Sequence, residues 1–141
     1  MPNRSTTAPN KSGVVKITSM AWGWTPVSRA ELNDLIAADL RDASDEERAY
    51  FNSVAVEPSK WRQSPYGDEG GGFWAVAVDG DRVLWYNDIE EGFNVSRFTV
   101  LGTIPDDEYW CNQDQLPWAL PNLRGLSRSG NLGPPEPLPD E

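Results

Sequence analysis

The stretch that most constrains the fold is 73–104, FWAVAVDGDRVLWYNDIEEGFNVSRFTVLGTI. Its first two runs, FWAVAVD and RVLWYND, alternate along the chain with a period of two, which is typical of β-strands. Between them Asp79-Gly80 supplies the positive φ that a tight hairpin turn requires. The third run, 95–104, is expected to return beside the second. The stretch therefore predicts an antiparallel meander at the centre of the fold.

The faces of this meander follow from the alternation. A two-residue loop at Asp79-Gly80 and a four-residue loop over 79–82 give different registers but the same assignment of faces. One face is predicted to carry Trp74, Val76, Val78, Val83 and Trp85, and the other Phe73, Ala75, Ala77, Leu84 and Tyr86. Because neither set is polar, both faces of the sheet could be covered.

Two helices are predicted before the meander from their N-terminal signals. Ser28 with Glu31 three residues later forms a capping-box pattern, followed by an apolar stripe at helical spacing. Ser44 and Glu47 repeat the pattern ahead of a second, shorter helix. A last helical turn or two is expected within 112–120, with Asp114 as its N-cap and Pro121 ending it.

The remaining segments complete the expected architecture. A strand is predicted at 14–20 and a long loop, rich in glycine and proline, at 57–72. The ends, 1–12 and 125–141, have the composition of a flexible arm and a disordered tail, which leaves a single domain at 13–124. The sequence thus predicts an α+β fold: an antiparallel sheet of three to four strands with an N-terminal helical pair and a short C-terminal helix.

Charge and composition exclude several function classes. Twelve Lys and Arg against 22 Asp and Glu give the 141-residue chain a formal net charge of -10, which disfavours nucleic acid and anionic membranes as partners. The absence of histidine removes the commonest general base and metal ligand, and Cys111 stands alone. We therefore expect no metal and no cofactor. Without an apolar leader or spanning segment, the chain is expected to be cytoplasmic.

The most suggestive segment is the connection 87–94, because it crowds three carboxylates beside two large apolar residues. Its glycine comes too early for the calcium-binding loop of an EF-hand. Two interpretations stay open: the apolar side chains fold into the core while the acids are solvated, or the segment docks a partner. The docking interpretation gives a partner-binding set of Asp88, Ile89, Glu90, Glu91 and Phe93, together with Trp61 and Tyr66 from the preceding loop.

Catalytic functions have weaker support in the sequence. A glycosidase needs two acids at a fixed spacing and a sugar platform. Acids are available at Asp68, Asp88, Glu90 and Glu91, and a platform at Trp61 or Trp85. Cys111 has no histidine to activate it, so it is expected to be a small core residue, and no catalytic residue is predicted. Of the seven tryptophans, at least one among Trp22, Trp24 and Trp61 is expected to be partly exposed.

The expected order of elements, one strand, two helices, three strands and a helix, resembles small bacterial proteins of the SMI1/KNR4 type, several of which serve as immunity proteins. The likeness is one of element order, so no residue role is carried over. Exposed aromatic side chains beside carboxylates fit a binding surface for a basic partner. We therefore expect a non-catalytic, acidic interaction protein of the inhibitor or immunity type. A carbohydrate- or small-ligand-binding domain that uses tryptophan is the alternative, and a carboxylate-dependent hydrolase is the third.

Overall fold

The computed structural model describes residues 25–125 and residue 133. The predicted arm at 1–12 and the predicted strand at 14–20 lie outside this part of the chain, as does nearly all of the predicted tail at 125–141.

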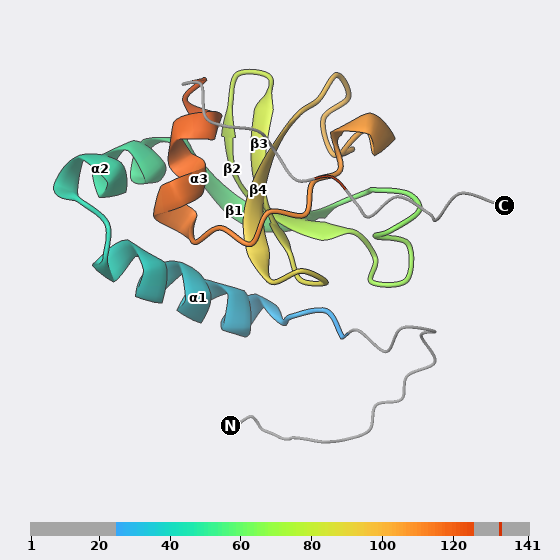
Figure 1. The fold of residues 1–141 in the computed structure, drawn as a ribbon, viewed down its shortest axis with the longest axis horizontal. Coiled ribbons are helices and arrows are strands. Elements are labelled where there is room, and N and C mark those ends of the chain that lie inside the picture. Colours follow the sequence, from blue (N-terminus) through green and yellow to red (C-terminus); the bar gives the residue numbers. More distant parts are fainter. Residues whose placement is uncertain (1–24, 126–132, 134–141) are drawn as a thin grey trace, which may run out of the picture.

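The described residues form an α+β fold in which a four-stranded antiparallel sheet has the strand order β1-β2-β3-β4 (Figure 1). Along the chain the elements are α1 (Arg29–Arg41), α2 (Asp45–Val54), β1 (Ala55–Trp61), β2 (Phe73–Asp79), β3 (Arg82–Asn87), β4 (Gly92–Arg97), the short 3-10 helix η1 (Asp106–Glu108) and α3 (Leu116–Leu123). The helical pair before the meander and the short C-terminal helix confirm the predicted fold class.

Both predicted capping boxes are present at the starts of α1 and α2. The Ser28 hydroxyl accepts from the Glu31 amide at 3.0 Å, and the Glu31 carboxylate accepts from the Ser28 amide at 2.8 Å. Ser44 and Glu47 make the same reciprocal pair at the start of α2. These bonds satisfy amide groups that have no partner within the helix, which explains why both helices begin where the sequence indicates.

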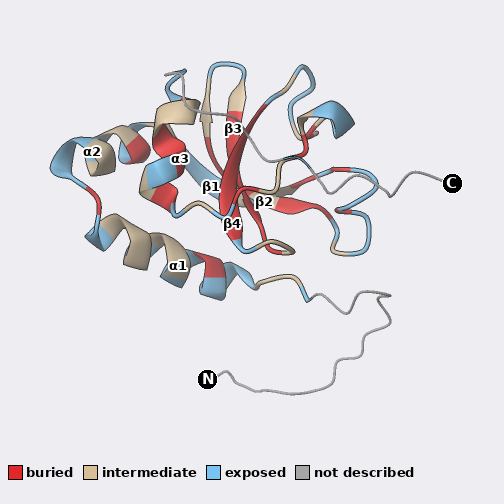
Figure 2. Ribbon diagram, viewed as in Figure 1, coloured by how far each residue is buried: buried red, intermediate tan, exposed pale blue. Residues whose placement is uncertain are grey.

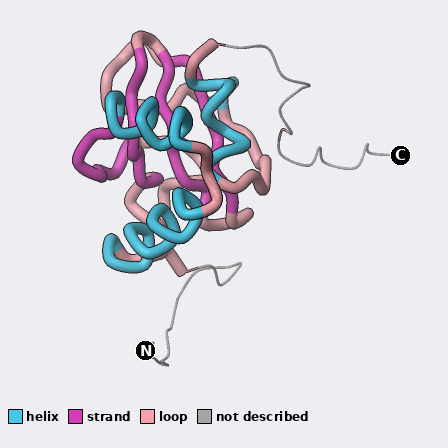
Figure 3. The backbone as a smooth tube through the Cα atoms, turned by 90° about the vertical axis from the view of Figure 1, so that its left-hand side faces the viewer, coloured by secondary structure: helices cyan, strands magenta, loops and turns pink. Residues whose placement is uncertain are grey.

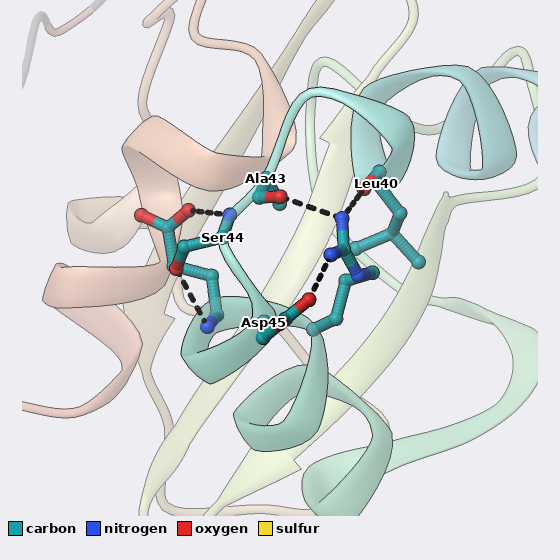
Figure 4. Close-up of polar contacts among 6 residues, drawn as sticks. Leu40, Ala43, Ser44 and Asp45 are labelled. Atoms are coloured by element: carbon teal, nitrogen blue, oxygen red, sulfur yellow. Dashed lines mark hydrogen bonds and ion pairs between the residues drawn. The ribbon is translucent and has the colours of Figure 1, made fainter.

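The turn between α1 and α2 is fixed by a single arginine. The Arg48 guanidinium donates to the carbonyl oxygens of Leu40 at 2.9 Å and Ala43 at 2.6 Å, and it also pairs with Asp45 (Figure 4). The Leu40 carbonyl lies in the last turn of α1 and the Ala43 carbonyl in the link to α2, where backbone acceptors lack helical partners. Arg48 therefore holds the end of one helix against the start of the next.

Strand β1 begins at Ala55 and occupies the first part, 57–61, of the segment 57–72 that was predicted to be a loop. Ser59 pairs with Ala75, and Trp61 with Phe73. The prediction was wrong because β1 is an edge strand that is mostly exposed and contains Pro58, so its sequence carries no apolar alternation.

The hairpin between β2 and β3 corrects the predicted faces. Its loop is Gly80 and Asp81, with Gly80 at φ 63°, so that Asp79 pairs with Arg82. The register then shifts between Ala75 and Ala77, which places one extra residue in β2. Side-chain direction alternates along a strand, so one extra residue exchanges the two faces. The side chains of β2 before Ala77 therefore lie on the opposite faces from those that a regular strand would give them.

Two hydrophobic cores result, one on each face of the sheet. The first core includes Trp74, Val76, Ala77, Leu84 and Tyr86 from the hairpin. The second core includes Phe73, Ala75, Val78, Val83 and Trp85. The predicted faces were wrong only for the residues of β2 before Ala77, which are Phe73, Trp74, Ala75 and Val76. The separation of Ala77, Leu84 and Tyr86 from Val78, Val83 and Trp85 is as predicted, and both faces of the sheet are covered.

Different layers cover the two faces. Leu32 of α1, Phe51 of α2 and Leu120 of α3 enter the first core, so the helices lie together on one side of the sheet (Figures 1 and 3). The second core is closed by Ile104 and Tyr109, which belong to the chain between β4 and α3. As a result β3 and β4 are buried along most of their length (Figure 2).

The outer edge of β4 is covered mainly by side chains. Asn94 donates to the carbonyl of Asn112 at 3.0 Å and accepts from the Asn112 amide at 2.9 Å, as a neighbouring strand would. The Ser96 hydroxyl donates to the carbonyl of Glu108 at 2.5 Å. At Gly92, an added Cβ would lie 2.2 Å from the Asn112 carbonyl oxygen, so only glycine allows this close approach.

Strand β4 and helix α3 differ in extent from the predictions. β4 ends at Arg97, not at 104, and the chain then turns through Gly102 at φ 93°, leaving Leu101 exposed at the tip. Helix α3 begins after Gln115, not after Asp114, and it includes Pro121. Its first amide is capped from another helix, because the Leu116 N–H donates to the Asp39 carboxylate at 2.8 Å.

Among the helices of residues 25–125, none combines the length and apolar character needed to cross a bilayer.

Candidate functional site

The connection between β3 and β4 is a tight turn held by Asn87. The Asn87 side-chain oxygen accepts from the amides of Ile89 at 3.0 Å and Glu90 at 3.2 Å, and the Glu91 amide donates to the Asn87 carbonyl at 2.7 Å. The Asn87 amide group also donates to the Tyr109 hydroxyl at 3.1 Å. Because asparagine can bond to the backbone two or three residues ahead, it fixes the turn and attaches it to the chain before α3.

Asp88 points inward from this turn and is only 8% exposed. One carboxylate oxygen, Oδ2, accepts from the Val27 amide at 2.9 Å, immediately before α1. The other, Oδ1, is buried and has no hydrogen-bond partner. Burial raises the pKa of Asp88 to about 6, against the lowering effects of the Val27 amide and of Lys60. Asp88 therefore positions the start of α1 and offers little surface to a partner.

The start of α1 is held by a second contact with the sheet. The Trp74 indole N–H donates to the Val27 carbonyl at 2.9 Å, while the Val27 amide donates to Asp88. The amide and the carbonyl of Val27 are thus paired with one side chain from the β3–β4 turn and one from β2. This arrangement explains the burial of Asp88, which both interpretations of the sequence placed at the surface.

The apolar side chains of the predicted set fold inward. Phe93 is 2% exposed and belongs to the first core, and Ile89 is half-buried against the second core. Trp61 is 5% exposed, with its ring edge-on to Phe98 at 5.0 Å between centroids. Of the two interpretations left open for the turn, the structure follows the first for Phe93 and Ile89, so a partner would contact neither Phe93 nor Trp61.

The rest of the predicted set faces outward, and part of it is brought together. Tyr66 is 40% exposed, and its ring stacks on the ring of Tyr109 at 4.2 Å with an interplanar angle of 14°. Glu90 is half-buried, and its charge raises the pKa of Tyr109, although burial has the larger effect. Glu91 is exposed next to it. Tyr66 and Glu90 therefore share Tyr109 as a neighbour.

The sheet topology explains why Tyr66 and Glu90 lie at the same end of the sheet. In an antiparallel sheet with strand order β1-β2-β3-β4, the β1–β2 connection and the β3–β4 turn lie at the same end, opposite the β2–β3 turn (Figure 1). Tyr66 belongs to the first connection and Glu90 to the second. We refer to Tyr66, Glu90, Tyr109 and Cys111 as the Tyr66 surface.

Cys111 is a half-buried member of this surface. Burial and the neighbouring Glu90 carboxylate raise the pKa of the Cys111 thiol, against the lowering effect of a hydrogen bond with Tyr109. The thiolate is the nucleophilic form of cysteine, so a raised pKa lowers the share of thiolate at neutral pH. Cys111 also packs against the second core.

Neither Trp61 nor Trp85, the two tryptophans proposed as a sugar platform for a glycosidase, lies on the surface. Trp61 is buried, and Trp85 is fully buried with its indole N–H donating to the Ser96 hydroxyl at 2.8 Å. Asp68 is exposed on the β1–β2 connection, where it accepts from the Ser64 hydroxyl at 2.6 Å. Trp22 and Trp24 lie outside the described residues, and among the described tryptophans Trp118 of α3 is the exposed one, at 59%.

A cleft of about 420 Å³ lies between the start of the β1–β2 connection and the chain before η1. Its lining includes Arg62, Ser64, Thr103 and Asp106. A hydrolase that depends on two carboxylates would need two of them to converge, and this cleft has one. Over 25–125 no three acidic or cysteine side chains gather closely enough to hold a metal ion.

Sequence reasoning missed two residues that build the site, Asn87 and Tyr109. Asn87 could have been found, because asparagine at the start of a short connection is a recognised turn signal. Tyr109 could not, because its contact with Tyr66 depends on how the second core closes.

No family model matches the chain, and neither a curated protein nor a solved structure matches it.

Proposed function

We propose that the chain is a non-catalytic interaction protein of the inhibitor or immunity type, which binds a basic protein partner through the Tyr66 surface and the adjacent Glu91. The observation that carries the proposal is an exposed aromatic ring, Tyr66, stacked on Tyr109 beside the Glu90 carboxylate. Tyrosine supplies contact area at low entropic cost, and carboxylates at the rim attract a basic partner.

The distribution of charge supports a basic partner. Most arginines of the described chain already contact acids of the same chain, so they do not offset the acidic excess elsewhere. The ion pairs are Arg29 with Glu57, Arg48 with Asp45, Arg82 with Asp81, Arg97 with Glu108 and Arg124 with Glu46. With a formal net charge of -10, the surplus acids give the molecule a negative field that accelerates the approach of a cationic protein.

The rigidity of the site also supports binding. Tyr66 lies in a turn whose amides bond to the buried Gln63, and the Glu90 amide bonds to Asn87. A surface that is already ordered loses less conformational entropy when a partner binds.

The test begins with capture of a partner by the tagged full-length chain from its own cells, followed by purification of the captured protein. The double variant Glu90→Gln and Glu91→Gln should then slow association by several-fold at low salt and flatten its salt dependence, because rim charges act mainly on the association rate. The matched control is Asp106→Asn with Asp107→Asn, which removes two exposed acids from η1. Equal association rates for all three proteins would contradict the proposal.

A further inference from the structure

We infer that the C-terminal segment 134–139, PPEPLP, docks on the Trp110 side chain of the same chain as a polyproline II helix, with the Trp110 indole N–H donating to one of its carbonyl oxygens. This inference goes beyond the proposed function, because Trp110 is not a member of the Tyr66 surface. It is argued from a buried donor without an acceptor, from the position of Gly133 and from the sequence that follows Gly133.

The buried donor is the indole N–H of Trp110. The Trp110 side chain is half-buried, and its Nε1 is buried without a hydrogen-bond partner in the described part of the chain. The indole groups of Trp74 and Trp85, in contrast, donate to the Val27 carbonyl and the Ser96 hydroxyl. Indole nitrogen can only donate, and a buried donor without an acceptor destabilises the fold. Trp110 therefore has a place for one acceptor.

Gly133 shows which part of the chain is near this donor. The described chain reaches Gly125 after α3 and resumes at Gly133. A Cβ added to Gly133 would lie 4.0 Å from Cζ3, in the six-membered ring of Trp110, which is an ordinary contact distance. The residues that follow Gly133 therefore begin next to the ring.

The sequence after Gly133 is suited to an aromatic side chain. PPEPLP has four prolines in six residues, and proline favours the backbone angles of a polyproline II helix. Six residues in this conformation extend about 19 Å, and none of their carbonyl oxygens is used within the helix. Proline-rich segments bind to aromatic side chains in this conformation at low entropic cost. The segment can therefore supply both a surface for the ring and an acceptor for the N–H.

The covalent connection makes a weak contact sufficient. Because Gly133 already lies beside Trp110, the segment is present at an effective concentration on the order of millimolar or higher. The composition of 125–141 also agrees with docking, since such a segment has no core of its own and is ordered only by what it binds.

The experiment compares the full chain with a full-length glycine variant by two-dimensional NMR of the indole N–H groups, together with their rates of exchange with solvent. The glycine variant combines Pro134→Gly, Pro135→Gly, Pro137→Gly and Pro139→Gly. A further variant, Trp110→Phe, identifies the Trp110 signal because that signal disappears.

We expect the Trp110 signal to shift in the glycine variant and its proton to exchange about five-fold faster or more, because four flexible residues replace four restricted ones and the hydrogen bond is lost. The signals of Trp74 and Trp85 should not change, which shows that the variant is folded. A synthetic peptide of residues 133–141 added at millimolar concentration should restore the original Trp110 signal. The control is Pro2→Gly with Pro9→Gly, which changes two prolines near the other end of the chain and should leave the Trp110 signal as it is.

Two results would overturn the inference. One is a Trp110 signal with the same position and exchange rate in the full chain and in the glycine variant. The other is a difference that appears only at high protein concentration, because the segment would then dock on a second copy of the chain. Neither result bears on the proposed function, which is tested separately through Glu90 and Glu91.

Discussion

Replacement of Asp88 by asparagine tests whether burial dominates the energetics of this acid. In the folded chain burial raises the pKa of Asp88 from 3.8 to about 6, whereas in the unfolded chain the carboxyl group regains water and its ordinary pKa. A carboxyl group with a raised folded-state pKa favours folding when protonated. Its contribution is therefore full below about pH 4 and is lost as the pH rises through about 6.

The magnitude follows from the difference between the two pKa values. Each unit corresponds to about 1.4 kcal/mol, so ionised Asp88 lowers the free energy of unfolding by roughly 3 kcal/mol relative to a neutral side chain. Asparagine is neutral, has the same shape and can keep the bond from the Val27 amide. Its NH₂ group would take the place of the unpaired Oδ1, at a cost of about 1 kcal/mol or more. We expect Asp88→Asn to stabilise the chain by about 1 to 2 kcal/mol near neutral pH.

The assay is urea unfolding followed by tryptophan fluorescence, with wild type and Asp88→Asn compared at a series of pH values from about 4 to about 8. The stability difference should be largest at neutral pH and should fall by about 2 to 3 kcal/mol toward pH 4, where the wild type should be the more stable protein by about 1 kcal/mol. Asp34→Asn, exposed on α1, serves as the control for a general loss of charge. A difference that grows on acidification would refute the reasoning, because it would mean that Val27 and Lys60 lower the pKa more than burial raises it.

Three further outcomes can be measured in the same unfolding assay. Gly92→Ala should lower the free energy of unfolding by about 3 kcal/mol or more, because its Cβ would meet the backbone of Asn112 and Gln113. Gly80→Ala, in open space at φ 63°, should lower it by about 1 kcal/mol. Equal losses would contradict the close approach at Gly92. Asp39→Ala should cost about 1 kcal/mol by uncapping Leu116 of α3, and Asp39→Asn should recover most of it. Phe93→Ala should cost about 3 to 5 kcal/mol, and a near-neutral result would place Phe93 outside the core.

The helices were predictable because their signals are local. Ser28 with Glu31 and Ser44 with Glu47 each place a hydroxyl and a carboxylate three residues apart, and the resulting bonds form whatever the rest of the chain does. Helix α3 was less predictable because its first amide is capped by Asp39, which belongs to α1. A cap supplied from elsewhere leaves no pattern at the helix itself.

The sheet was predictable in its hairpins but not in its edge or its faces. Strand β1 is held by backbone pairing with β2, and that pairing makes few demands on exposed side chains such as Glu57 and Ser59. The bulge in β2 depends on how Ala75 and Ala77 fit opposite β3, which the alternation of the sequence does not record.

The candidate site was predictable in part. Tyr66 and Glu90 were predicted as members of one partner-binding set, and the sheet topology brings their two connections to the same end of the sheet. Burial of Asp88 was not predictable, because it depends on the Val27 amide reaching across from the start of α1. Long-range contacts of this kind are decided by packing, which has no local signature.

The two edges of the sheet limit how another chain could join it. A fifth strand beside β4 would have to displace the bonds between Asn94 and Asn112 and the bond from Ser96 to Glu108. Beside β1 it would meet Pro58, which has no N–H to donate, and an irregular register. Recognition by strand addition is therefore disfavoured at both edges, as is edge-to-edge aggregation of the molecules. A partner would instead have to recognise side chains on the connections at the end of the sheet.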